Sequence, residues 1–159
     1  MISMILNYKT VLPVIFRLVL GIVFIYAAID KISDPYTFAV DIRNYRILPD
    51  IFSNFFALIL PWIELFCGLF LIIGIFIRSS AIIIAAMLMV FILAISLAMI
   101  RGLNIDCGCY HTMGESTKIG YNKLIEDFIY LIMAGYLFLT VNIGPAIQIK
   151  KRSNSIKRI

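Results

Sequence analysis

The sequence predicts an all-α integral membrane protein, a four-helix bundle with a short amphipathic helix in its first outer loop. Two observations indicate this fold class. Hydrophobic residues make up 62% of the 159-residue chain and charged residues only 14%, whereas an ordinary soluble domain carries about 25% charged residues. In addition, four apolar stretches are each long enough to cross a bilayer, which takes about 20 helical residues. We therefore expect the lipid bilayer to be the solvent of this chain.

The predicted spans cover about residues 11–29, 52–76, 80–100 and 124–143. We expect the first span to be retained rather than removed as a signal peptide, because Arg17 interrupts what would be the apolar core of such a signal. The second and third spans are joined by only a few residues around Arg78 and should form a tight antiparallel hairpin. Residues 1–149 are thus predicted to be a single transmembrane domain.

Basic residues suggest how the bundle is oriented, because they concentrate on the cytoplasmic side of a membrane. An even number of spans places both termini on one side. That side holds seven basic residues and no acidic one: Lys9, Arg78, Lys150, Lys151, Arg152, Lys157 and Arg158. The opposite loops hold six basic residues: Lys31, Arg43, Arg46, Arg101, Lys118 and Lys123. The dense cluster in the tail, residues 150–159, favours cytoplasmic termini and a multi-pass protein of the inner, cytoplasmic membrane.

The basic tail has two readings. A cluster of lysines and arginines could hold nucleic acid. Directly after an apolar span, however, it is more simply a topology anchor beside anionic lipid headgroups. We therefore expect no nucleic-acid partner.

A short helix is predicted at the start of the first outer loop. Asp34 and Pro35 provide an N-cap and a first-turn proline. Apolar side chains recur at helical spacing over residues 38–45, with Asp41 and Asn44 on the other side. This pattern is typical of an amphipathic helix lying on the membrane surface.

Arg17 and Glu64 are the charged residues well inside the predicted spans, and either alone would cost at least ~3 kcal/mol near the bilayer centre. At 1.5 Å per residue, Arg17 lies about 9 Å and Glu64 about 18 Å above the inner ends of their spans. The arginine side chain can bridge most of that difference, so we predict that the two form a pair. The pair could simply fix helix register. Alternatively Glu64, beside Pro61 and Trp62, could line a cavity for a proton or a quinone headgroup, with Arg17 contributing.

The three cysteines do not form one cluster. Cys67 lies about 24 Å below the outer end of the second span and is expected to be a small buried apolar residue. Cys107 and Cys109 flank Gly108 in a polar loop just beyond the third span. A disulfide across one residue should be strained and therefore exchangeable, and it closes too small a loop to staple a fold. These two cysteines are the predicted redox pair.

Two other interpretations of the cysteine pair remain open. His111, the single histidine of the chain, alternates with Cys107 and Cys109, so the three could hold Cu(I) or Zn²⁺. The set lacks an obvious fourth ligand. The cysteines could also form an inert structural bridge.

Three groups of residues, in order along nearly the whole chain, carry a family resemblance: residues 30–35 with Phe38, Tyr45, Leu48 and Pro49; residues 61–64 with Gly68 and Gly74; and Arg101-Gly102 leading into Cys107-Gly108-Cys109. They resemble the MauE branch of the DoxX-like membrane proteins. The chain departs from the usual pattern after Cys109, where Tyr110 and His111 replace the family's Phe-Gly.

The resemblance implies a four-helix membrane bundle that helps to process, transport or mature the small subunit of methylamine dehydrogenase. That subunit is rich in disulfides, and the resemblance implies that a thioredoxin-like protein is its maturation partner in the same system. Our leading hypothesis is a thiol–disulfide component in which Cys107 and Cys109 act on a thioredoxin-like protein or a secreted disulfide-containing client. Electrons would pass to a quinone near Glu64, although oxidases of the DsbB type use two cysteine pairs and this chain has one usable pair. The alternatives are a non-catalytic assembly factor, a metal-handling membrane protein and a DoxD-like quinone-linked oxidoreductase.

Overall fold

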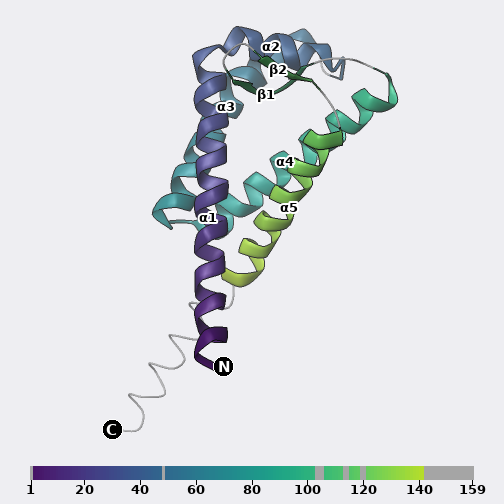
Figure 1. Cartoon of the computed structure of the whole chain (residues 1–159). Coiled ribbons are helices and arrows are strands. Elements are labelled where there is room, and N and C mark those ends of the chain that lie inside the picture. Colours follow the sequence, from purple (N-terminus) through teal and green to yellow (C-terminus); the bar gives the residue numbers. More distant parts are fainter. Residues whose placement is uncertain (1, 48, 103–105, 113–114, 119–120, 142–159) are drawn as a thin grey trace.

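The structure is a computed structural model of the chain, and it describes residues 2–47, 49–102, 106–112, 115–118 and 121–141 (Figure 1). Side chains are described for residues 11–47, 49, 51–102 and 121–140. The predicted basic tail, residues 150–159, lies outside the described residues.

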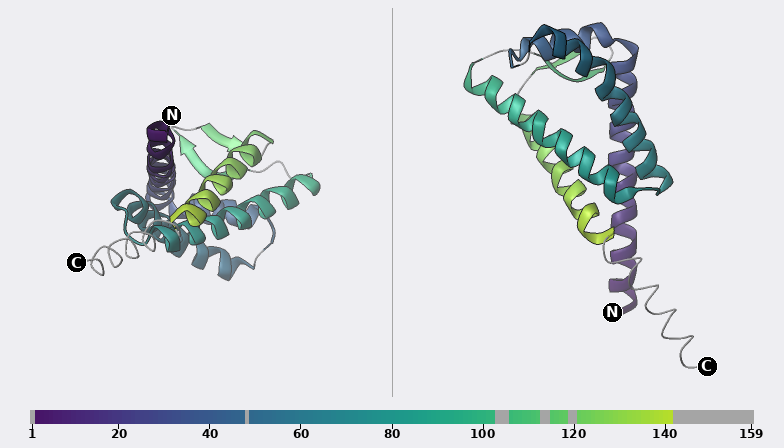
Figure 2. Two further views of the ribbon diagram at one scale, coloured as in Figure 1. Left: turned by 90° about the horizontal axis from the view of Figure 1, so that it is seen from below. Right: turned by 180° about the vertical axis from the view of Figure 1, so that it is seen from behind.

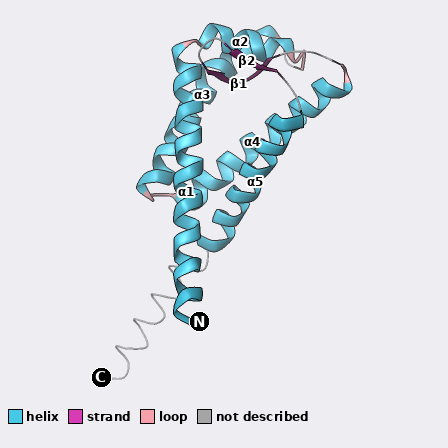
Figure 3. Ribbon diagram, viewed as in Figure 1, coloured by secondary structure: helices cyan, strands magenta, loops and turns pink. Residues whose placement is uncertain are grey.

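The described part of the chain forms five helices and two strands (Figure 3). In chain order they are α1 (Ile2–Ser33), α2 (Pro35–Asn44), α3 (Asp50–Ile73), α4 (Ile77–Ile100), β1 (Asp106–Thr112), β2 (Glu115–Lys118) and α5 (Tyr121–Val141).

The long helices form two pairs that diverge like the arms of a V (Figures 1 and 2). α1 packs against α3 in one arm, and α4 packs against α5 in the other. α3 and α4 are joined by the short connection at the closed end of the V, where α1 also contacts α5. α2 and the two strands lie at the open end, with α2 packed on α3 and β1 in contact with α1 and α2.

Among the residues that the structure describes, three helical segments are long and apolar enough to cross a membrane: Val11–Ser33, Ile51–Ile73 and Ile77–Ile100. They correspond to the first three predicted spans and indicate a multi-pass membrane protein. The first extends beyond the predicted end at residue 29 and takes in Lys31. The fourth predicted span, 124–143, coincides with α5 up to Val141, and its last two residues lie outside the described part.

α1 and α3 approach closely because two glycines face each other across the contact. A Cβ atom added to Gly21 would lie 2.6 Å from Ile72 Cγ1 and 3.0 Å from the carbonyl oxygen of Gly68. One added to Gly68 would lie 2.9 Å from the carbonyl oxygen of Gly21. Membrane helices associate through such small residues, since lipid gives no hydrophobic drive between them. Below this contact the apolar core is continuous across both arms, and its fully buried members include Leu20, Leu71, Ile84, Ala134 and Leu137.

The predicted helix of the first loop is α2, and its N-cap is the predicted Asp34. The Asp34 carboxylate accepts hydrogen bonds from the Thr37 backbone N–H at 3.0 Å and from its hydroxyl at 2.6 Å. Asp41, however, is buried rather than on an outward polar side. The reason is that α2 packs against α3 and carries β1, so less of its circumference is open than in a helix lying alone on a membrane.

The segment after α4, expected to be an irregular polar loop, contains an antiparallel pair of strands. Asp106 pairs with Lys118, His111 with Ser116 and Thr112 with Glu115, and the register shifts between the first two pairs. The all-α prediction therefore holds for the long elements and misses this hairpin. Few apolar residues alternate in it, so the usual signal of a strand is absent from the sequence.

Candidate functional site

A buried ion pair joins α1 to α3 at the open end of the V. The Lys31 ammonium nitrogen lies 2.7 Å and 2.8 Å from the two carboxylate oxygens of Glu64. Only 4% of Lys31 and 1% of Glu64 is exposed. The same nitrogen lies 5.1 Å and 5.2 Å from the ring centroids of Phe38 and Phe91, within the range of cation–π attraction. Lys31 is thus held by a carboxylate and by two aromatic faces.

A second group of charged residues lies in the first two turns of α5. Lys123 Nζ lies 2.7 Å from Glu126 Oε2 and 3.8 Å from Asp127 Oδ1. The Tyr130 hydroxyl donates a hydrogen bond of 3.2 Å to the other oxygen of Glu126. Lys123 and Asp127 are buried, whereas 46% of the Glu126 side chain is exposed. Asp127 Oδ2 has no hydrogen-bond partner among the described residues.

Both groups line the same small cavity. It has a volume of about 40 Å³, and its polar walls are Lys31, Glu64, Lys123, Asp127 and Tyr130. This volume suits one water molecule, and the polar walls provide the partners that a buried water requires. The structure therefore brings two ion pairs, Lys31 with Glu64 and Lys123 with Asp127, to one place in the bundle. Such a set can hold a water molecule and exchange protons with it.

The predicted pairing of Arg17 with Glu64 is wrong, because Glu64 is bound by Lys31. Arg17 lies at the opposite end of α3, where a Cβ added to Gly74 would be 2.8 Å from the guanidinium. The backbone N–H of Gly74 ends α3 by donating to Phe70 O at 2.9 Å, so Arg17 lies beside the negative end of that helix dipole. The error arose from ending the first helix at residue 29, which left Lys31 in a loop.

Trp62 points away from both groups. Its side chain is 49% exposed, and its ring centroid lies 6.5 Å from that of Phe66 along the outer side of α3. The structure thus does not bring Arg17, Trp62 and Glu64 together. A quinone or proton site built from these three residues stays a prediction, and the three do not line one cavity among the described residues.

Cys67 lies apart from Cys107 and Cys109, as its depth in the second predicted span led us to expect. Cys67 is a buried free thiol in α3, packed in the core cluster with Leu20 and Leu71. Cys107, Cys109 and His111 all belong to β1, and their side chains lie outside the described part of the structure. The backbone of β1 contacts α1 and α2. Both the redox pair and the alternative metal set of Cys107, Cys109 and His111 therefore remain predictions about a strand whose place in the fold is known.

A sequence profile described as "Methylamine utilisation protein MauE" matches residues 9–140. The chain belongs to the MauE family. It is similar to the "Methylamine utilization protein MauE" of Paracoccus denitrificans, with 36% identity over 119 residues, which is 74% of this chain and 63% of the relative. It is also similar to the protein of the same name from Methylophilus methylotrophus, with 35% identity over 121 residues, or 76% of this chain and 64% of the relative. The match thus covers under two thirds of these relatives' length, and no solved structure matches.

The MauE match spans both charge groups and β1. Sequence reasoning missed Lys31, Lys123 and Asp127 as members of one buried group. Lys31 and Lys123 were assigned to the outer loops, and Asp127 was assigned to the start of the fourth span without a partner. A signal for them does exist. Lys31 continues the buried stripe of α1 formed by Leu20, Phe24 and Ala27, at helical spacing.

Lys123 and Asp127 likewise continue a buried stripe at helical spacing, this time along α5. Further along the same stripe lie Tyr130, which is half-buried, and the buried Ala134 and Leu137. Extending the apolar stripes of α1 and α5 by one or two further turns would have identified all three charged side chains of this MauE protein as buried.

Proposed function

We propose that this protein serves methylamine utilisation as a membrane accessory protein that exchanges a disulfide with a client outside the cytoplasm. Membership of the MauE family supports the pathway. The observation that carries the chemistry is the Cys107-Gly108-Cys109 run in β1, a strand packed on α1 and α2 at one end of the bundle. The end of a membrane bundle is the part that proteins outside the bilayer can reach.

The orientation that we propose completes a four-helix bundle with α5 as its fourth span. The charges of α5 at Lys123 and Asp127 turn inward, where they are buried. Beyond its first turn, the exposed large hydrophobic side chains of α5 are Ile125, Phe128, Ile129, Ile132 and Leu139. A helix with an apolar outer face and buried, paired charges is suited to lipid. Four spans would put both termini on one side of the membrane, and we propose that this side is the cytoplasm because the tail is basic. The cysteine strand would then lie on the outer side, in an oxidising compartment.

The exchange reaction is simple thiol–disulfide chemistry. A client thiolate attacks one sulfur of the Cys107–Cys109 disulfide, and a mixed disulfide forms as the other cysteine leaves. The second client thiol then displaces the bound cysteine. The client gains one S–S bond, and this protein is left with two thiols that carry the two electrons and two protons of the client. The client is a secreted disulfide-containing protein or a thioredoxin-like protein.

The buried charges have a structural part in this proposal. β1 rests on α1 and α2, and the Lys31–Glu64 pair ties α1 to α3 near that end. Lys31 also lies over the ring of Phe38 in α2. A single lysine thereby links α3 to α1 and α2, the two helices that contact the cysteine strand.

The test is to trap the cysteine states in cells with a maleimide that adds mass to free thiols. We expect Cys107 and Cys109 to be found partly as a disulfide that dithiothreitol reduces. In Cys109→Ser the Cys107 thiolate should attack a disulfide of the oxidised client, the reverse of the last step, and form a mixed disulfide that no second cysteine of the strand resolves. This adduct identifies the client. Cys67→Ser is the matched control, and it should leave the trapping pattern unchanged because Cys67 is buried in the core.

Two outcomes would contradict the proposal. Cys107 and Cys109 could stay fully reduced under all conditions, which removes the redox role. The double variant Cys107→Ser/Cys109→Ser could also support full methylamine-dependent growth. The protein would then be a non-catalytic assembly factor.

A further inference from the structure

The small polar cavity is the space of about 40 Å³ whose polar walls are Lys31, Glu64, Lys123, Asp127 and Tyr130. Among the buried side-chain atoms of these walls, Asp127 Oδ2 is the one without a hydrogen-bond partner in the described part of the chain. Asp127 itself is only 4% exposed. A buried carboxylate oxygen without a donor is costly, so this oxygen requires either a donor from outside the chain or a proton of its own.

The charged residues around the small polar cavity include one carboxylate in excess. Lys31 and Lys123 are the two cations, and Glu64, Glu126 and Asp127 are the three carboxylates. Uncompensated charge inside a membrane bundle is expensive. The uptake of one proton by one of the three carboxylates makes the group electrically neutral.

Asp127 is the buried carboxylate that can take this proton without leaving a buried cation unpaired. Lys123 lies 2.7 Å from Glu126 Oε2 and 3.8 Å from Asp127 Oδ1, so it keeps a partner when Asp127 is neutral. Glu64 differs, because both of its oxygens are bound by Lys31. A proton on Glu64 would leave the Lys31 ammonium buried without its counter-charge, which is strongly destabilising.

Glu126 connects Asp127 to the surface of the bundle, since 46% of its side chain is exposed. Lys123 contacts both Glu126 and Asp127. Tyr130 makes a second connection, because its hydroxyl donates to Glu126 at 3.2 Å and its side chain also lines the cavity. A proton can therefore pass between the exposed carboxylate and the cavity along polar groups, as in the proton relays of other membrane proteins.

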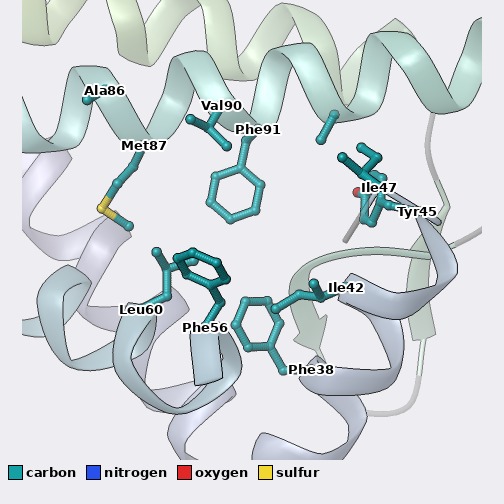
Figure 4. A pocket seen from close by; sticks show the side chains of 11 residues that line it. Phe38, Ile42, Tyr45, Ile47, Phe56, Leu60, Ala86, Met87, Val90 and Phe91 are labelled. Atoms are coloured by element: carbon teal, nitrogen blue, oxygen red, sulfur yellow. The ribbon is translucent and has the colours of Figure 1, made fainter. Parts of the chain in front are cut away.

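The remaining walls of the small polar cavity are apolar and include Phe91. Phe91 and Phe38 also line a larger cavity of about 480 Å³ between α2, α3 and α4 (Figure 4). No charged side chain is among the described residues that line this larger cavity. It thus provides no charged path for a proton, and Glu126 is the entrance that the described residues offer.

Other titratable groups could compete with Asp127 for the proton. Those of α1, α3 and α5 are the walls described above, and α4 contributes Leu88 and Phe91, which do not titrate. Tyr45, at the end of α2, is also affected by Asp127. Burial raises the pKa of the Tyr45 phenol, and the carboxylates of Asp41 and Asp127 raise it further. The phenol therefore stays protonated and does not accept the proton.

We propose that the small polar cavity is a proton-binding site in which Asp127 takes up one proton and releases it through Glu126. Uptake forms an O–H bond at Asp127 Oδ2 and converts the carboxylate into a neutral carboxyl group, while Lys123 stays paired with Glu126. No electron is transferred and no other bond changes. The inference is independent of the proposed disulfide exchange, because the residues that carry it belong to α1, α3 and α5.

The test is infrared difference spectroscopy of the full chain in phosphatidylcholine nanodiscs. The pH is lowered from about 8 to about 5, which is above the range in which exposed aspartates and glutamates mostly titrate. A protonated carboxyl group gives a C=O stretching band that an ionised one lacks, and the band shifts in D₂O. The wild type should gain the band of one such group. Labelling aspartate side chains with ¹³C should shift this band, and labelling glutamate side chains should not.

Variants assign the band to a residue. Asp127→Asn should abolish it, and Lys123 keeps Glu126 as a partner in that variant. Asp41→Asn is the matched control, because it changes the other buried aspartate among the described residues, and it should retain the band. Glu126→Gln should move the band to lower pH by about half a unit to one unit, since it removes the excess carboxylate and leaves Lys123 dependent on Asp127.

Three results would overturn the inference: a wild type that gains no protonated carboxyl band in this pH range, a band that shifts with labelled glutamate, or a band that persists in Asp127→Asn. The first result would mean that Asp127 stays ionised and that Oδ2 is satisfied by a bound water molecule instead. Because the labelling needs no substitution, it decides between aspartate and glutamate even if a variant fails to fold.

Discussion

Lys31 and Glu64, 33 residues apart in the chain, meet in the interior with the lysine nitrogen 2.7 and 2.8 Å from the two carboxylate oxygens. The pair joins α1 to α3 at the open end of the V. Its full burial means that each charge depends on the other. Two charges taken out of water lose much hydration, and their attraction offsets this loss only while both are present.

Glu64→Gln should therefore lower the free energy of unfolding by about 3–5 kcal/mol, because it leaves the Lys31 ammonium buried without its counter-charge. Lys31→Met should do the same for the Glu64 carboxylate. The measurement is unfolding of the purified protein by dodecyl sulfate in mixed micelles. The double variant Lys31→Met/Glu64→Leu should regain most of the loss, since no unpaired charge remains.

Arg17 provides the control for this cycle. Arg17 lies beside Gly74 and not beside Glu64. Arg17→Met and Glu64→Gln should therefore be additive within about 0.5 kcal/mol, as distant sites are. A coupling as large as that of Lys31 with Glu64 would show that the ion pair is wrongly assigned.

The close contact between α1 and α3 gives a second prediction. Gly68→Ala should lower the free energy of unfolding by about 1–3 kcal/mol, the usual effect of overpacking. The added Cβ would lie 2.9 Å from a backbone oxygen of Gly21, which cannot move without its helix. Gly135→Ala in α5 is the matched control, because nothing lies within 4 Å of its added Cβ. That change should be neutral or should stabilise the helix by up to about 1 kcal/mol. Equal effects at both glycines would argue against the close contact.

Hydropathy was sufficient to place the long helices because a lipid-facing helix must be apolar along its whole length. The predicted spans therefore agree with α1, α3 and α4 to within a few residues at most ends. The partner of Glu64 could not be found in this way. A lysine near a span end has the same local sequence whether it faces water or an acidic residue on another helix. Only the packing of α1 on α3 determines that Lys31 faces Glu64 rather than water.

The cysteine strand and the small polar cavity could not be predicted from the sequence, for related reasons. β1 has no alternating apolar pattern, and its place depends on contacts with α1 and α2. The small polar cavity depends on how α1, α3 and α5 pack against one another, which no local pattern encodes. Cys67 was predictable, because a cysteine deep in an apolar span is usually a buried small residue, and it is buried in the core.

Gly74 ends α3 in the left-handed region, with a φ of +89°. Gly74→Ala should lower the free energy of unfolding by about 1–2 kcal/mol, the cost of that backbone conformation for a residue with a Cβ. The new methyl group also meets the Arg17 guanidinium at 2.8 Å. Micelle unfolding of Gly74→Ala with and without Arg17→Ala separates the two causes. Most of the loss should persist without Arg17, since a flexible side chain can move aside. Full recovery would mean that the clash, and not the backbone, limits this position.

Lys123 contacts two carboxylates, and burial decides which contact matters more. Its distance to Glu126 is 2.7 Å and its distance to Asp127 is 3.8 Å, but the side chain of Glu126 is 46% exposed and that of Asp127 only 6%. Glu126→Gln should therefore cost no more than about 1 kcal/mol, as exposed pairs do. Lys123→Met should cost several times as much in the same micelle assay, because it removes the cation from a buried carboxylate that already has one oxygen without a partner among the described residues. Adding Asp127→Leu to Lys123→Met should restore much of the stability. If Glu126→Gln were the more damaging change, the shorter contact would be the dominant one and Asp127 would be reached by water.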